Sequence, residues 1–169
     1  RLHWRETRAI LQDTTPRILI VSSAYTQDVK NILADYPGQP SLELILETEG
    51  QALETSLSYR SVLNSASPEP AVQEAVDKET IAALIFTGGT TGSPKAAQVS
   101  HRMIAWNTLN TFIHDLRMDD VYLNVFPLFH TGGLFVYTLP QVVFGGTTIL
   151  VPRFDPEQIL ELIESERVN

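Results

Sequence analysis

Short apolar runs that alternate with helical patterns constrain the fold of this chain more than any other feature of its sequence. Residues 17–22 form a nearly continuous apolar run, which is typical of a strand covered on both faces of a parallel sheet. Residues 42–46 and 81–86 are further predicted strands, the second of them buried. Between the first two runs, residues 29–36 place one apolar stripe on a helix. This alternation predicts an α/β fold with a layered, mostly parallel sheet flanked by helices.

Residue spacing predicts one further helix, and capping residues predict two more. Residues 4–11 have the spacing of a short opening helix, and Ser100 can cap a second helix. Asp155 and Gln158 form a capping-box pattern around Pro156, which suits the first position of a third helix. These signals predict where helices begin, independently of the strand pattern.

The segment 47–80 is acidic and rich in small residues, and it has only weak helical patterns. We interpret it as a surface excursion and not as a domain boundary, so residues 1–169 are expected to form one piece. Beyond it, residues 121–125 and 147–151 are predicted strands.

Charge and composition exclude several classes of function. Twenty acidic against 12 basic residues give a net charge of -8, the wrong sign for neutralising a phosphate backbone, so nucleic acid is not expected as a partner. The absence of cysteine removes disulfides, thiolate metal sites and a cysteine nucleophile. No apolar run approaches the roughly 18 residues that span a bilayer. We therefore expect a cytoplasmic protein without a transmembrane segment.

The segment 87–95 follows directly on the predicted strand 81–86. Its sequence, Thr87-Gly-Gly-Thr-Thr-Gly-Ser-Pro-Lys95, contains three glycines, three threonines, a serine and a lysine. Glycines let backbone N–H groups approach phosphate oxygens, hydroxyls add donors or reach a phosphate-bound Mg²⁺, and Lys95 supplies positive charge. The composition predicts an anion-binding loop.

This loop differs from the P-loop of common nucleotide hydrolases. That pattern needs Gly-Lys-Ser/Thr in a fixed place after its first glycine, whereas Pro94 precedes Lys95 here. A flexible hairpin-like or linker loop is the plainer alternative, because glycine, threonine and serine are ordinary turn residues. Composition alone leaves both interpretations open.

Two motifs give the chain a resemblance to a known family. The stretch from Phe86 to Lys95, followed by Val99-Ser-His101, is similar to the signature of the acyl-adenylate-forming, or AMP-binding, superfamily. Pro127-Leu-Phe-His-Thr-Gly-Gly133 resembles the stretch of acyl- and aryl-CoA ligases whose histidine borders the acyl pocket. The two motifs stand in the family's order, and the resemblance covers nearly the whole chain.

The resemblance assigns roles to particular residues. Those that would hold the β- and γ-phosphates of ATP are Thr87, Gly88, Gly89, Thr90, Thr91, Gly92 and Lys95. His130, together with Gly132, would border the acyl group. The family usually has Ser where Gly88 stands and Gly where Ala96 stands. The hydroxyl missing at Gly88 weakens a phosphate contact by about 1 kcal/mol when backbone donors remain.

The resemblance also implies an activity. It is that of an ATP-dependent carboxylate–CoA ligase, an acyl-CoA synthetase of fatty acid metabolism. In this reaction a fatty or aryl carboxylic acid displaces pyrophosphate from ATP, and coenzyme A then takes the acyl group. ATP, Mg²⁺ and coenzyme A are the implied cofactors. Residues 1–169 are expected to be a fragment of the large N-terminal domain, truncated at both ends, with the small C-terminal domain and its catalytic lysine absent.

The expected truncation has consequences. We expect no catalytic residue and no metal ligand within the chain, and no turnover by the chain alone. A truncated sheet is also expected to expose apolar surface. The alternative is a non-catalytic phosphate-binding or interaction module that kept the loop and lost the chemistry.

Overall fold

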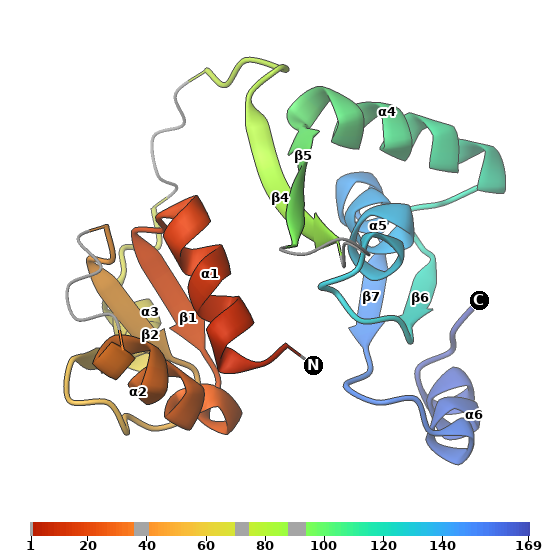
Figure 1. The fold of residues 1–169 in the computed structure, drawn as a ribbon. Helices are drawn as coiled ribbons and strands as arrows, with labels where there is room; N and C mark the ends of the chain where they lie inside the picture. The colour runs from red at the N-terminus through yellow and green to blue at the C-terminus, as the bar shows by residue number, and fades with distance from the viewer. Residues whose placement is uncertain (1, 36–40, 70–74, 88–93) are drawn as a thin grey trace. The chain divides into compact units, whose positions relative to one another are not determined.

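The computed structural model describes residues 2–35, 41–69, 75–87 and 94–169. They fall into two compact units, unit 1 (Arg1–Val72) and unit 2 (Gln73–Asn169), drawn from red to yellow and from green to blue in Figure 1. Two of the three sheets are parallel and one is antiparallel, which confirms the predicted α/β class with mostly parallel strands. Every helix within the described residues is too short or too polar to cross a membrane.

Unit 1 is built on a three-stranded parallel sheet. Its strands, in spatial order, are β1 (Ile18–Val21), β2 (Leu44–Glu47) and β3 (Ser56–Ser58). Its helices are α1 (Trp4–Thr14), η1 (Ser23–Tyr25), α2 (Thr26–Asp35) and α3 (Tyr59–Ser65). The first two strands confirm the prediction. The third strand, β3, lies inside the segment predicted as a surface excursion. It was not predicted, because Ser-Leu-Ser is too short and too polar to give a strand pattern.

The core of unit 1 forms where α2 and the segment after β2 contact the sheet. Val21, Val29, Ile45 and Leu53 are its buried residues, and Leu19, Leu33 and Leu42 pack against them. Val29 and Leu33 belong to the apolar stripe predicted for this helix, so helical spacing identified the face of α2 that is buried.

Glu47, the last residue of β2, is a fully buried carboxylate with 0% of its surface exposed. Its Oε1 accepts the N–H groups of Ala52 at 2.9 Å and Leu53 at 2.8 Å, and also the hydroxyl of Ser56. Its Oε2 accepts the Thr26 hydroxyl at 3.2 Å. The Ser56 hydrogen bond, helped by the backbone donors, lowers the pKa of Glu47 despite burial. One side chain thus joins the central strand to α2 and to the turn that follows.

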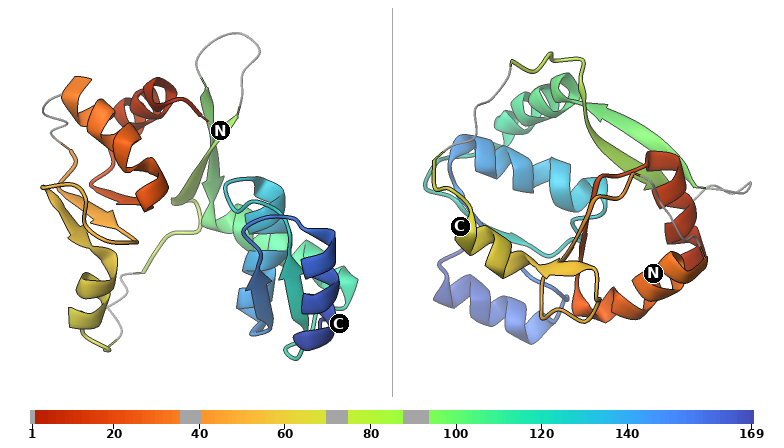
Figure 2. Two further views of the ribbon diagram at one scale, coloured as in Figure 1. Left: turned by 90° about the horizontal axis from the view of Figure 1, so that it is seen from below. Right: turned by 90° about the vertical axis from the view of Figure 1, so that its left-hand side faces the viewer.

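Unit 2 combines an antiparallel hairpin with a parallel strand pair. The hairpin is β4 (Ile81–Thr87) and β5 (Lys95–Ser100), and the parallel pair is β6 (Val121–Asn124) and β7 (Thr147–Leu150). Its helices are α4 (His101–Thr111), η2 (Phe112–His114), the π-helix η3 (Gly132–Thr138), α5 (Leu139–Phe144) and α6 (Pro156–Ser165). The continuous η3–α5 segment lies beside α4 (Figure 2).

The hairpin differs from the prediction for residues 81–86. We predicted a buried strand, but Ile81 is 43% exposed and Leu84 is 41% exposed within the described chain. The reason is that β4 pairs with β5 in a two-stranded antiparallel sheet instead of entering a larger parallel sheet. The partner strand β5 was not predicted, because Lys-Ala-Ala-Gln-Val-Ser has no clear apolar alternation.

The predicted helix starts of unit 2 are confirmed. Ser100 caps α4, its Oγ accepting the N–H of Met103 at 3.3 Å. Asp155 caps α6, its Oδ1 accepting the N–H groups of Glu157 at 3.1 Å and Gln158 at 3.3 Å. Local capping chemistry therefore fixes both helix starts.

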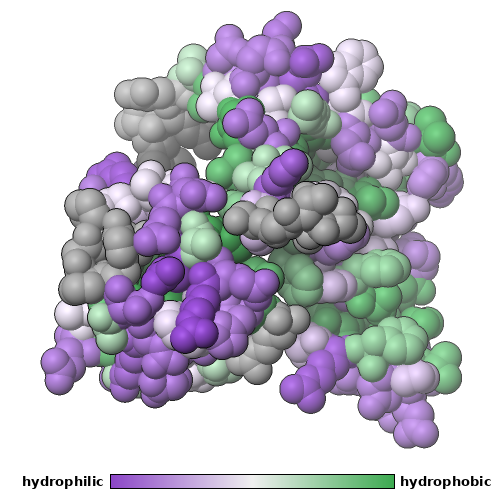
Figure 3. All heavy atoms as spheres, in the orientation of Figure 1, coloured by the Kyte–Doolittle hydropathy of each residue, from purple (hydrophilic) through white to green (hydrophobic). Residues whose placement is uncertain are grey.

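Apolar side chains remain exposed on unit 2, as expected. Along α4 these include Met103, Trp106 and Leu109, and on α6 they include Leu160 and Ile163. Figure 3 shows hydrophobic residues, in green, reaching the surface in the part of the view that holds this unit. The described residues therefore leave part of the apolar surface of α4 and α6 uncovered.

Replacing Glu47 by Gln is expected to destabilise the protein by about 2 kcal/mol, because an NH₂ group then faces donors that need an acceptor. Urea unfolding followed by circular dichroism measures the loss. Glu49→Gln is the matched control: this exposed carboxylate accepts the Ser23 N–H at 2.9 Å, and its loss should cost much less.

The same pair of variants tests the ionisation of Glu47. Because folding lowers its pKa, the stabilising effect is complete above the ordinary value of 4.5 and is lost as pH falls below it. The difference between wild type and Glu47→Gln should shrink in that range. A difference that stays constant from neutral pH down to strongly acidic pH would contradict the assignment.

Candidate functional site

The segment 87–95 connects the two strands of the β4–β5 hairpin. The register pairs Thr87 with Lys95, and the Thr87 hydroxyl donates a hydrogen bond to the Lys95 carbonyl oxygen at 3.3 Å. Both residues are exposed. Directly opposite residues of an antiparallel pair present their side chains on one face. A hydroxyl and an ammonium group thus belong to one face at the end of the hairpin, which suits a phosphate ligand.

The other predicted phosphate-binding residues, Gly88, Gly89, Thr90, Thr91 and Gly92, lie outside the described residues. Their roles stay predictions. The flanking strands β4 and β5 pair as an antiparallel hairpin. The plainer interpretation and the phosphate-binding one both stay predictions.

His130 lies in the turn that links β6 to η3. Its backbone N–H donates to the Pro127 carbonyl at 3.1 Å, and its own carbonyl accepts the N–H groups of Gly133 and Leu134, both at 3.1 Å. The side chain is exposed, and its Nδ1 accepts the N–H of Gly132 at 3.2 Å. Because Nδ1 is an acceptor, the neutral imidazole carries its proton on Nε2. His130 can therefore donate that proton in a hydrogen bond to a carboxylate or carbonyl oxygen.

Gly133 allows a close approach between η3 and the preceding turn. A Cβ atom at this position would lie 2.3 Å from the carbonyl oxygen of Pro127 and 2.8 Å from that of Phe126. Both are backbone atoms that cannot swing aside. Gly132 is different, because a Cβ there would meet only His130 Nδ1, at 3.5 Å. Close packing thus explains the second glycine of the motif but not the first.

Asn124, the last residue of β6, ties the turn to η3. It is 1% exposed; its Nδ2 donates to the Gly133 carbonyl at 3.1 Å and to Thr138 Oγ1 at 3.0 Å, and its Oδ1 accepts the Phe126 N–H at 2.8 Å. The Thr138 hydroxyl donates to the same Gly133 carbonyl at 2.6 Å. Neither residue was singled out from the sequence. An available signal was an asparagine within a strand pattern, where this residue type is depleted.

A cavity of about 370 Å³ lies at the carboxyl ends of β6 and β7. Its lining is mainly apolar and comes from the end of β6, the turn before His130 and the residues after β7: Asn124, Phe126, Pro127, Leu128, Phe129, Leu150, Val151 and Pro152. Ligands of parallel α/β sheets bind at this edge. The cavity therefore suits an apolar group, and Phe129, the residue before His130, is part of its lining.

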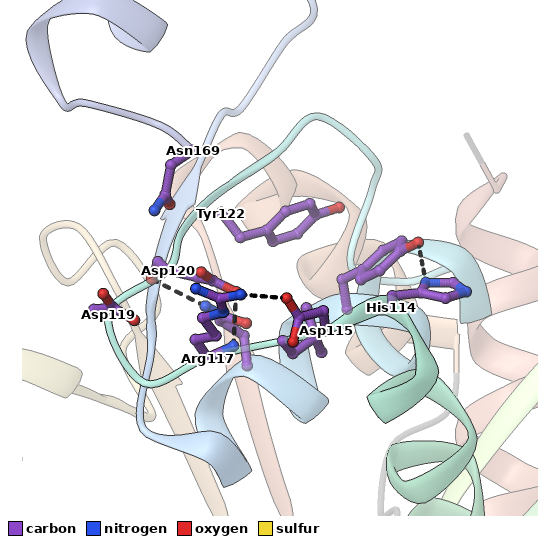
Figure 4. Close-up of a pocket in the computed structure, with 10 residues that line it drawn as sticks. His114, Asp115, Arg117, Asp119, Asp120, Tyr122 and Asn169 are labelled. Atoms are coloured by element: carbon purple, nitrogen blue, oxygen red, sulfur yellow. Dashed lines mark hydrogen bonds and ion pairs between the residues drawn. The ribbon is translucent and has the colours of Figure 1, made fainter.

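A second cavity, of about 530 Å³, lies at the opposite, amino end of β6 (Figure 4). Its lining includes Asp115, Asp119 and Asp120, and Arg117 lies among these carboxylates. The hydrogen bond from Arg117 to Asp115, at 2.5 Å, raises the pKa of the guanidinium group. Three carboxylates against one guanidinium repel phosphate groups. Among the described residues, none of the predicted site residues lines this cavity.

The profile of the AMP-binding enzyme family matches residues 1–169, and the chain belongs to this family. Indoleacetate–CoA ligase of Aromatoleum aromaticum is 32% identical over 176 residues, which cover 99% of this chain and 33% of that protein. Feruloyl-CoA synthase of Amycolatopsis sp is 38% identical over 108 residues, which cover 63% of this chain and 22% of that protein. The chain thus spans about a third or less of the length of these relatives.

Solved structures show the same fold. The inhibitor-bound N-terminal domain of FACL13 from Mycobacterium tuberculosis has a TM-score of 0.80 and 27% identity, over 99% of this chain and 40% of that one. ATP-bound MatB from Rhodopseudomonas palustris has a TM-score of 0.76 and 28% identity, over 96% of this chain and 31% of that one. The α/β architecture is therefore that of the N-terminal domain of acyl-CoA ligases, as the sequence motifs predicted.

Replacing Gly133 by Ala is expected to destabilise unit 2 by about 2 kcal/mol, because the added methyl group overlaps the backbone of the turn. Gly132→Ala, one residue away, provides the control and should cost less than about 1 kcal/mol. Urea unfolding of the two variants measures the difference. Equal losses would show that the close approach to Phe126 and Pro127 does not matter.

Proposed function

We propose that this protein acts as an ATP-dependent carboxylate–CoA ligase whose acid substrate carries an apolar fatty or aryl group. The observation that carries the proposal is the apolar cavity at the carboxyl ends of β6 and β7, beside the turn of His130. Support comes from relatives that are named for indoleacetate and feruloyl groups, both of which contain an aromatic ring. In this proposal the protein is cytoplasmic and takes part in the metabolism of such acids.

The β4–β5 hairpin is the nucleotide side of the proposed site. Lys95 would offset negative charge on the β- and γ-phosphates as pyrophosphate leaves. The Thr87 hydroxyl would exchange its hydrogen bond to the Lys95 carbonyl for one to a phosphate oxygen. Bound Mg²⁺ would supply further charge neutralisation. The described residues contain no group of three or more His, Asp or Glu side chains suited to a metal, so the proposal assigns the ion to the phosphates and the loop hydroxyls.

The β6–η3 turn is the acid side of the proposed site. The apolar cavity would hold the body of the acid, and Nε2 of His130 would donate a hydrogen bond near its carboxylate. One carboxylate oxygen then attacks the α-phosphorus of ATP, and the bond to pyrophosphate breaks. In the second step, the coenzyme A thiol, on losing its proton, attacks the acyl carbon and AMP leaves. Positioning, and not acid–base catalysis, is the contribution proposed for these residues.

The proposed activity is that of a whole protein, since the chain spans about a third of its longer relatives. A protein made from the complete coding region is expected to release pyrophosphate when ATP and an aryl or fatty acid are both present. The chain of residues 1–169 is expected to show no turnover. ATP binding without acid-dependent release by the complete protein would instead favour a non-catalytic phosphate-binding module.

Replacing Lys95 by Met in the complete protein is expected to lower kcat/KM for ATP about 100-fold, because one charged contact to the leaving group is lost. KM for the acid should change little. Lys78→Met is the matched control, since Lys78 is an exposed lysine outside the 87–95 segment. Pyrophosphate release gives the rates, and an unchanged kcat/KM in Lys95→Met would overturn the assignment of this loop.

A further inference from the structure

We infer that Asn124 and Thr138 are positioning residues that act through the turn of His130 to set the affinity for the carboxylic acid. This inference rests on the proposed function. It assigns no direct contact with the nucleotide or with the reacting atoms to either residue. The two side chains belong to β6 and to the end of η3, on either side of the motif that the sequence identified.

The hydrogen bonds of Asn124 are all made within the protein. Both polar atoms of its carboxamide are engaged, with Nδ2 donating twice and Oδ1 accepting once. The residue is 1% exposed, although it is one of the residues that line the apolar cavity. A carboxamide with all these hydrogen bonds has little capacity left to bind a ligand. Asn124 would therefore affect acid binding through the residues to which it is hydrogen-bonded.

What Asn124 holds is both ends of the turn. Its Oδ1 fixes the N–H of Phe126, where the turn begins, and its Nδ2 fixes the carbonyl of Gly133, where η3 begins. His130 lies between these two points and shares hydrogen bonds with Pro127 and Gly133. Movement of either fixed point therefore moves the imidazole relative to the cavity.

The π-helical form of η3 is held by side chains from neighbouring elements. A π-helix is rare and is frequently found at functional sites. Asn107 of α4 donates from Nδ2 to the Phe135 carbonyl at 2.5 Å. The Thr111 hydroxyl shares its proton between the Asn107 carbonyl at 2.8 Å and the Val136 carbonyl at 3.3 Å. Together with Thr138 and Asn124 at the Gly133 carbonyl, these donors fix the register of the helix that follows His130.

Within the part of the chain that the structure describes, the side-chain hydrogen bonds of Asn124 and Thr138 lie on the acid side of the proposed site. Their partners are Phe126, Gly133 and each other, and none belongs to the described residues of the β4–β5 hairpin. A positioning role therefore predicts that loss of these hydrogen bonds changes KM for the acid without changing KM for ATP. A purely structural role predicts lower stability and no difference between the two KM values.

Thr138→Val tests the inference, because valine keeps the shape of threonine and removes its hydroxyl. In the complete protein we expect KM for the acid to rise about tenfold, while KM for ATP stays within about twofold. Thr138→Ser restores the hydroxyl and should restore KM for the acid. Asn124→Asp, which keeps the acceptor for Phe126 but removes both donors, should act in the same direction as Thr138→Val.

Two results would overturn the inference: equal changes in KM for acid and ATP, or a lower unfolding midpoint with unchanged KM values.

A second readout uses the chain of residues 1–169 and needs no turnover. In amide NMR spectra, Thr138→Val should shift the signals of Phe126 and His130 but not those of Thr87 and Lys95, and Thr138→Ser should not. Inactive wild type would refute the proposed function, whereas unshifted Phe126 and His130 signals would refute the positioning role.

Discussion

The carboxamide of Asn124 connects the parts of unit 2 on which the candidate site depends. Its three hydrogen bonds join the end of a parallel strand to the start of the following turn and to both the beginning and the end of η3. Buried polar groups are costly unless they are paired, so a fully paired one specifies a single arrangement of its neighbours. Gly133 contributes the complementary constraint, since only a residue without Cβ allows η3 to approach the turn so closely.

Unit 1 also has a buried, hydrogen-bonded polar side chain at the last residue of a parallel strand. Glu47 ends β2 as Asn124 ends β6, and both side chains are buried and accept N–H groups of the chain that follows. The outcomes differ, however. The Glu47 carboxylate is surrounded by donors from α2 and from the segment after β2, whereas Asn124 lines a cavity and precedes a turn that bears an exposed histidine. The carboxyl end of the strands is therefore open to a ligand in unit 2.

Sequence analysis predicted the features that arise from local chemistry. The caps at Ser100 and Asp155 were found because each helix start is specified within a few residues. The strands β3 and β5 were missed because their pairing partners, and not their own apolar patterns, make them strands. Glu47 and Asn124 were missed for a related reason: their importance comes from burial and from partners brought close by folding. The motif around His130 was visible in the sequence, but the network beneath it was not.

The proposed function requires that a carboxylic acid binds at the carboxyl ends of β6 and β7. Amide NMR of the isotope-labelled chain during a titration with phenylacetate locates such binding without requiring turnover. Shifts are expected for Phe126, Phe129 and Val151, which line the apolar cavity. Shifts confined to Asp115, Asp119 and Asp120, at the opposite end of the strands, would contradict the proposed function.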